Sequence, residues 1–98
     1  MINYIPLEEV LAIRDRIMEV TGGRKGILDF ALLHSAIERP KATFAGKDLY
    51  PTIFDKASAL IHSLILIHPF NDGNKRTALA VTVRFLYING YELDYNFD

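Results

Sequence analysis

The stretch that decides the fold is residues 57–83, "ASALIHSLILIHPFNDGNKRTALAVTV". Its two apolar parts, 57–67 and 77–83, contain no Asp, Glu, Lys or Arg, which is typical of helices buried at the centre of a bundle. Pro69 prevents the first part from continuing as a helix, and the Asn-Asp-Gly that follows is a strong turn signal. We therefore predict a central hairpin of two apolar helices, the second beginning at about Asn74.

The bulk properties of the chain limit its class. With 98 residues, half of them hydrophobic, residues 1–98 fit one small domain with a compact core. The net charge of -1 gives no general basic field for nucleic acid, and the lack of cysteine excludes disulfides and thiolate metal sites. The N-terminus has no signal-peptide pattern, and the longest uncharged run is shorter than the roughly 20 apolar residues of a membrane span. We expect a cytoplasmic protein without a membrane partner.

Two further helices are predicted before the central hairpin. Residues 6–23 form the first and end at Gly22–Gly23, and one face should be core because apolar residues recur there at helical spacing: Val10, Ile13, Ile17 and Val20. The second helix, "FALLHSAIER", should follow Asp29 as its N-cap and end at Pro40. Its expected core stripe consists of Phe30, Leu33 and Ile37.

Minor β structure completes the predicted fold. Residues 41–50, "KATFAGKDLY", have no helical period, and we interpret them as an exposed loop or a short hairpin. Pro51 should begin the third helix, and Asn89–Gly90 should cap the fourth in the left-handed conformation. The tail 91–98 alternates apolar and polar residues, as a half-buried strand does. The fold class is therefore mainly α, a small helical bundle with minor β structure.

The connection between the central helices concentrates charge at an unusual place. Lys75 and Arg76 fall in the first turn of the predicted fourth helix, where the helix dipole is already positive. A Gly-containing turn that feeds a helix N-terminus is suited to bind an anion, especially phosphate, and arginine can grip two phosphate oxygens. Gly73 can adopt positive φ or allow close backbone approach. Both cations are well placed only if an anion binds there.

Three other residues of this connection have suitable chemistry. Asp72 offers the hard oxygen ligand that Mg²⁺ takes together with nucleotide phosphates. His68 could act as a general base, because an unperturbed imidazole titrates near neutral pH. Phe70 should be a buried anchor that fixes the path of the loop. Taken singly, each has an ordinary alternative: His68 as a helix cap, Asp72 as a turn residue, and the cations as solvated or paired side chains.

The other histidines are weaker candidates. His62 lies within the apolar helix, and we interpret it as a hydrogen-bonded core residue. His34 should be half exposed on the second helix. His62 and His68 lack the i, i+4 spacing of a helical zinc pair, and there is no obvious third ligand.

At residues 68–76 the sequence resembles the Fic/Doc superfamily, whose signature is H-P-F-x-D/E-G-N-G/K-R. "HPFNDGNKR" matches every fixed position. The "ERP", "YP", "RTAL" and "NGYEL" segments are similar to the Doc (death-on-curing) branch, so the resemblance covers nearly the whole chain. It implies a single Fic/Doc-like domain over 1–98; Doc-like chains usually continue past "NGYEL" with further helix.

The resemblance implies a role for each motif residue. His68 would be the general base that takes a proton from a hydroxyl of a target protein, and Asp72 would be the Mg²⁺ ligand. The remaining nucleotide-binding positions would be Gly73, Asn74, Lys75 and Arg76, with Phe70 as structural anchor. Fic enzymes that transfer AMP have glycine at the position of Lys75, which leaves room for the terminal phosphates of ATP.

Lys75 is shared with Doc-type proteins, so the resemblance implies an ATP- and Mg²⁺-dependent kinase that transfers the γ-phosphate. The implied target is a translation elongation factor, and the implied result is growth arrest. Targets in this superfamily are typically held by main-chain pairing to a flap. Here the flap would consist of Lys41, Ala42, Thr43, Phe44, Ala45, Gly46, Lys47 and Asp48.

The resemblance also implies how the protein would be regulated, and several rival functions stay open. Self-restrained Fic enzymes have an S/T-x-x-x-E helix, but no Ser or Thr here is followed by Glu four residues later. Restraint would then come from a separate, Phd-like antitoxin. The alternatives are a Fic-type AMP transferase and a non-catalytic truncated interaction module. A helical DNA-binding module is weaker, because no basic recognition helix stands out.

Overall fold

The computed structural model describes residues 1–21, 29–66 and 74–92 of the chain. In chain order the elements are α1 (Leu7–Thr21), α2 (Phe30–Glu38), the 3-10 turn η1 (Arg39–Lys41), β1 (Thr43–Phe44), β2 (Lys47–Asp48), α3 (Ile53–Leu66) and α4 (Asn74–Ile88). The mainly α class is confirmed, and so is the small β hairpin, in which β1 and β2 are antiparallel. None of the helices in these three ranges is long and apolar enough to cross a membrane.

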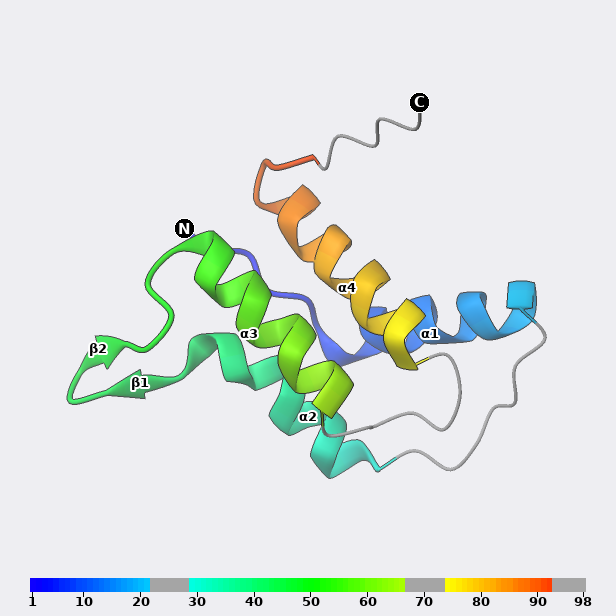
Figure 1. The fold of residues 1–98 in the computed structure, drawn as a ribbon, viewed down its shortest axis with the longest axis horizontal. Helices are drawn as coiled ribbons and strands as arrows, with labels where there is room; N and C mark the ends of the chain where they lie inside the picture. The colour runs from blue at the N-terminus through cyan, green and yellow to red at the C-terminus, as the bar shows by residue number, and fades with distance from the viewer. Residues whose placement is uncertain (22–28, 67–73, 93–98) are drawn as a thin grey trace.

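The predicted central hairpin of two helices is confirmed, because α3 and α4 lie side by side and pack against each other more extensively than any other pair (Figure 1). α2 and η1 pack on α3, while α1 packs on α4. The core lies between these helices and is formed mainly by aliphatic side chains and one phenyl ring: Val10, Leu33, Leu60, Leu64, Val81 and Phe85. Burial of their apolar surface is the main stabilising contribution to the bundle.

Local caps explain where the helices begin and end. Asp29 accepts a hydrogen bond from the Leu32 amide at 3.0 Å, so the predicted N-cap of α2 is confirmed. α3 begins at Ile53, slightly later than predicted, because Thr52 is its cap: the Asp55 amide donates to the Thr52 hydroxyl, and the Thr52 amide donates to the Asp55 carboxylate. At the end of α4, Gly90 has φ +92° in the predicted left-handed cap.

Two predicted core positions are wrong. Val20, near the end of α1, is 72% exposed, and Phe30, at the start of α2, is 56% exposed. Both lie at helix ends, where they project beyond the packed face. The buried line of α1 instead contains Arg14 and Met18, at four-residue steps from Val10. The predicted Ile13 and Ile17 are half-buried at its edge.

The prediction that His62 is a core residue is also wrong, because its side chain is exposed. α3 is not covered all round: Phe54, Ser58, His62 and Leu66, at four-residue steps, form an exposed line along the helix. A mostly apolar helix in a bundle this small still has one side facing water. His34 is exposed on α2, where 62% of its side chain is accessible and it pairs with Glu38 at 3.3 Å.

The predicted C-terminal strand is not observed in residues 91–92. Tyr91 and Glu92 belong to no strand, and residues 93–98 lie outside the described residues. Tyr91 instead packs its ring edge-on against Phe54 of α3, with the ring centroids 5.0 Å apart. This contact lies where the end of α4 meets the start of α3 and leaves Tyr91 partly exposed.

The N-terminal segment is fastened to the end of α4. The Asn3 amide donates to the Asn89 side-chain oxygen at 2.8 Å, and the Asn89 side-chain nitrogen donates back to the Asn3 carbonyl at 2.8 Å. The same nitrogen donates to the Phe85 carbonyl at 2.7 Å, and Asn3 donates from its side chain to the Ile88 carbonyl at 3.2 Å. These contacts bring two distant parts of the sequence together beside the capped end of α4.

Candidate active site

The first turn of α4 presents cations to solvent. α4 begins at Asn74, as predicted, and Lys75 and Arg76 are both exposed, while the turn contains no acidic residue. Thr77 and Ala78, the next two residues, are fully buried, so the rotation of the helix directs its opening cations outward and the following side chains into the core. The hydroxyl of Thr77 has no partner among the described residues. This helix end therefore combines a positive dipole with two accessible cationic side chains.

The remaining residues of the predicted motif cannot be placed. His68, Phe70, Asp72 and Gly73 lie outside the described residues, and of Asn74 only the backbone is described. The general base, the anchor, the metal ligand and the anion-holding turn therefore stay predictions. Within residues 1–21, 29–66 and 74–92, no three His, Asp or Glu side chains form a group that could hold a metal ion.

Arg76 also lies at one end of an open groove of about 560 Å³ that follows the outer face of α4. The lining residues recur at helical spacing and are Arg76, Leu79, Ala80, Val83, Arg84 and Tyr87. Leu79 and Tyr87 are about half exposed, so this side of α4 is apolar between two arginines. Arg84 is held at its place by Glu9 of α1, with the Nε and carboxylate oxygen 2.7 Å apart.

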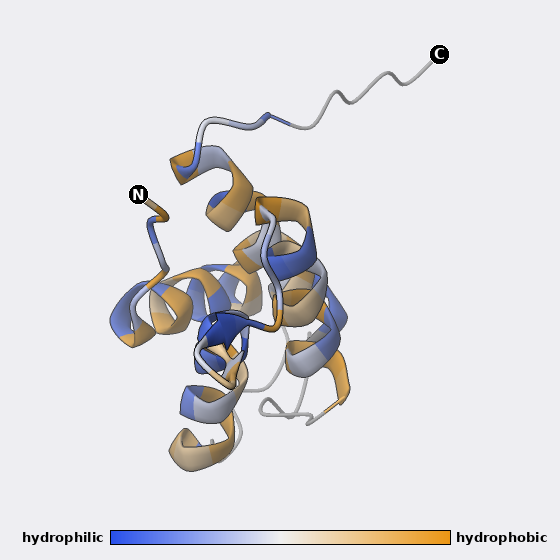
Figure 2. Ribbon diagram, turned by 90° about the vertical axis from the view of Figure 1, so that its left-hand side faces the viewer, coloured by the Kyte–Doolittle hydropathy of each residue, from blue (hydrophilic) through white to orange (hydrophobic). Residues whose placement is uncertain are grey.

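The predicted flap, residues 41–48, contains a β hairpin with a two-residue turn. Thr43 pairs with Asp48 and Phe44 with Lys47, and the turn residues Ala45 and Gly46 have φ of +53° and +79°. Positive φ at both turn positions is the conformation that matches the twist of a two-residue hairpin. The strands are exposed, and Figure 2, seen from the hairpin side, shows the hydrophilic β2 in front of the helices. Such a hairpin offers free strand edges for main-chain pairing.

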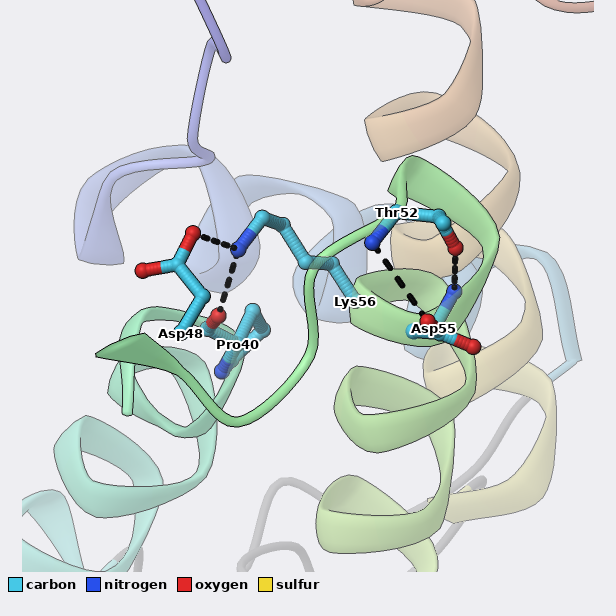
Figure 3. A network of polar contacts seen from close by, with 5 residues as sticks. All are labelled: Pro40, Asp48, Thr52, Asp55 and Lys56. Carbon is cyan, nitrogen blue, oxygen red and sulfur yellow. Dashed lines mark hydrogen bonds and ion pairs between the residues drawn. The ribbon is translucent and has the colours of Figure 1, made fainter. Parts of the chain in front are cut away.

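Contacts at the base of the hairpin join it to the helices. The Leu49 amide donates to the Ala42 carbonyl at 2.9 Å, which closes the hairpin across its two strands. Lys56, on the first turn of α3, donates from Nζ to the Pro40 carbonyl and to the Asp48 carboxylate, each at 3.3 Å (Figure 3). The Lys56 side chain is buried, with 2% of its surface exposed, whereas Asp48 is about half exposed.

Lys56 was not among the residues predicted to be functional. A signal existed, because Lys56 falls on the apolar stripe of α3 between Ile53 and Leu60, at a position where only a buried side chain fits the helical period. A lysine there must find acceptors in the interior, since an unpaired buried charge is strongly unfavourable. The identity of those acceptors could not be read from the period.

A second, smaller pocket was also missed. It has a volume of about 230 Å³ where η1 meets the C-terminal half of α3, and its lining residues are Arg39, His62, Ser63 and Leu66. Arg39 donates from Nε to the Tyr50 hydroxyl at 2.8 Å and lies 5.8 Å above the Tyr50 ring. Its guanidinium is thereby oriented beside the hairpin base.

Comparison with known proteins gives a consistent result. The model of the Fic/DOC family matches residues 4–86. The chain is 44% identical over 98 residues to "Toxin Doc" of Mycolicibacterium smegmatis, which covers all of this chain and 73% of that protein. It is 31% identical over 91 residues to "Protein kinase doc" of Escherichia phage P1, which covers 93% of this chain and 71% of that protein. No solved structure matches the chain.

Proposed function

This chain belongs to the Fic/Doc family, and on that premise we propose that it is a Doc-type toxin of a toxin–antitoxin pair. It transfers the γ-phosphate of ATP to a hydroxyl of a target protein. The target is a translation elongation factor, and the modification arrests translation. The relatives named "Toxin Doc" and "Protein kinase doc" support the toxin and kinase parts of this proposal.

The observation that carries the proposal is the exposed pair Lys75 and Arg76 in the first turn of α4, with no acidic residue beside them in that turn. Cations at a helix N-terminus are unfavourable for the isolated helix, by about 0.3–1 kcal/mol each at an exposed site. A triphosphate bound there would make the placement of these cations favourable, because the dipole and both side chains would then face the same anion. Arg76 would grip two phosphate oxygens, and Lys75 would occupy the space that decides which phosphate is transferred.

The proposed chemistry is an in-line phosphoryl transfer. His68 takes the proton of the target hydroxyl, the hydroxyl oxygen forms a bond to the γ-phosphorus, and the bond to the β,γ-bridging oxygen breaks to release ADP. Arg76 and the N–H groups at the start of α4 stabilise the negative charge on the transferred group. Asp72 would hold Mg²⁺, which supplies neutralisation of the phosphate charge when it is bound with the nucleotide.

The hairpin provides a surface to which a target protein could bind. A target segment would add to a free edge of β1 or β2 by main-chain hydrogen bonds, and residues 41–48 would thus present its hydroxyl to His68. The partner that restrains the enzyme is a separate, Phd-like antitoxin, as expected for a relative of "Toxin Doc". ATP and Mg²⁺ are the required small ligands.

Two labelled nucleotides test the function. Purified chain, Mg²⁺ and separately purified bacterial elongation factors are incubated with ATP labelled at the γ- or the α-phosphate. We expect label on one factor from γ-labelled ATP only, and none with His68→Ala.

The other outcomes identify the rival functions. Label from α-labelled ATP would establish AMP transfer. Absence of transfer together with no Mg²⁺–ATP binding by calorimetry would favour a non-catalytic interaction module and would reject both enzymatic functions.

A further inference from the structure

Lys56 is one of the largest fully buried side chains of the described residues, and it is a cation. Its aliphatic part lies on the core-facing stripe of α3, while its Nζ reaches out of the helix to the hairpin. Ordering a lysine in this way is costly in side-chain entropy and in lost hydration. An apolar residue of similar length would fill the same space without that cost, so packing alone does not explain the lysine.

The two acceptors of Lys56 lie on opposite arms of the hairpin. The Pro40 carbonyl precedes β1, and the Asp48 carboxylate is at the end of β2; each is 3.3 Å from Nζ (Figure 3). Pro40 is itself buried, whereas most of the hairpin beyond it is exposed. One buried group therefore fixes both arms of an otherwise exposed hairpin to a rigid helix.

The start of α3 is fixed as well. Thr52 and Asp55 cap it reciprocally, with the Asp55 amide 3.0 Å from the Thr52 hydroxyl, and Lys56 follows directly (Figure 3). α3 also leads, through its last described residue Leu66, to the segment that contains His68. The helix that holds the hairpin is thus the same helix that precedes the proposed general base.

We infer that Lys56 is a positioning residue, which sets the orientation of the hairpin on α3 and thereby the placement of a target segment paired to the hairpin. This inference rests on the proposed function, in which residues 41–48 hold the target. Lys56 acts through the hairpin and touches neither nucleotide nor target. Misplacement of a reacting group by about 1 Å can reduce a rate by about 100-fold, so a buried tether of this kind has a measurable effect.

Lys56→Met is the primary variant, because methionine keeps an apolar, unbranched side chain in the core but has no ammonium. Asp48 is about half exposed and remains hydrated without its partner, so the variant contains no buried unpaired charge. The Pro40 carbonyl loses one buried hydrogen bond, so the urea midpoint should fall only modestly. Arg16→Met is the control: it removes a positive charge from an exposed side chain of α1, outside the hairpin and the proposed nucleotide site.

Hydrogen exchange of the intact chain tests the tether without any enzymatic reaction. In Lys56→Met the amides of Ala42 and Leu49 should exchange about tenfold faster than in wild type, while core amides of α3 and α4 keep their rates. Arg16→Met should leave all of these unchanged. Asp48→Asn, which keeps an acceptor oxygen but loses the charge, should give a smaller effect of the same sign.

Phosphoryl-transfer kinetics test the positioning role. With a purified bacterial elongation factor as target, Lys56→Met should lower kcat/KM for the target about tenfold and leave the KM for ATP unchanged. Equal hairpin exchange and equal target kcat/KM in Lys56→Met and Arg16→Met would overturn the inference. So would a fall in urea midpoint with equal losses toward ATP and target, which is a purely structural effect. If wild type transfers no phosphate while the exchange changes as expected, the proposed function fails and the tether stands.

Discussion

The two ends of α4 are built in opposite ways. At the C-terminal end the Gly90 amide donates to the Tyr87 carbonyl at 3.0 Å, the Tyr91 amide donates to the Leu86 carbonyl at 2.9 Å, and Asn89 bonds to the N-terminal segment. At the N-terminal end Lys75 and Arg76 are exposed, with charges that oppose the helix dipole. One end is thus satisfied by the protein itself, while the other is suited to an anion.

This difference separates stability from function within one helix. Changes at the C-terminal end remove contacts that the folded chain makes, so they should lower the free energy of unfolding. Changes at the N-terminal end remove exposed side chains, so they should affect ligand binding and leave the fold intact. The three variants below test this division, from the largest expected effect to the smallest.

Arg76→Ala should have the largest effect. We expect phosphoryl transfer to fall by about 100-fold or more, because a donor that stabilises the transferred phosphate is lost. The free energy of unfolding should change by less than about 0.5 kcal/mol, as is usual for an exposed side chain. Transfer from γ-labelled ATP and urea unfolding measure the two quantities.

Arg84→Ala is the matched control, since Arg84 lies on the same face of α4 two turns further on. It loses an exposed ion pair with Glu9, worth at most about 1 kcal/mol, and should transfer phosphate at the wild-type rate. Wild-type transfer by Arg76→Ala would contradict the proposed phosphate site.

Lys75→Gly should change which phosphate is transferred. Removing the side chain opens space at the start of α4, so we expect γ-phosphate transfer to drop about tenfold and label from α-labelled ATP to appear on the target. Lys75→Ala separates the size of the side chain from the backbone freedom of glycine. If Lys75→Gly transfers γ-phosphate normally and never AMP, Lys75 does not select the phosphate.

Asn89→Ala tests the opposite end. The variant loses three hydrogen bonds of the Asn89 side chain, so the free energy of unfolding should fall by about 2 kcal/mol, with phosphoryl transfer per folded molecule unchanged. Asn3→Ala loses only the bond to the Ile88 carbonyl and should cost about 1 kcal/mol or less. Urea unfolding followed by circular dichroism compares them. A loss of phosphoryl transfer per folded molecule in Asn89→Ala would contradict the separation of stability and function between the two ends of α4.

Local signals made much of the fold predictable. Asp29 before an apolar helix, and Asn-Gly at the end of another, act through neighbouring backbone groups, so these caps were predicted correctly. The hairpin was predicted for the same reason, because Gly46 tolerates the positive φ of its turn. Burial was less predictable, because it depends on which helices cover a given face. Val20, Phe30 and His62 are exposed, since no other helix covers them among the described residues.

The candidate site was predictable where it rests on sequence order and not where it rests on distant contacts. The start of α4 at Asn74 was predicted from the turn signal in the sequence, and Lys75 and Arg76 are exposed there. Lys56 could not be assigned, since its partners are 16 and 8 positions earlier in the chain, in η1 and β2. The pocket that Arg39 and His62 line could not be predicted either, because these two residues are far apart in the sequence.

The pairing of Asn3 with Asn89 has a consequence for folding during synthesis. The two residues are 86 positions apart, so the contact closes a loop that spans nearly all of the described chain. On a ribosome the chain emerges from its N-terminus, and Arg76 therefore leaves the exit tunnel before Asn89 does. The cationic end of α4 thus emerges before the other end can be fastened, and the Asn3–Asn89 contact can form only after residue 89 has left the tunnel.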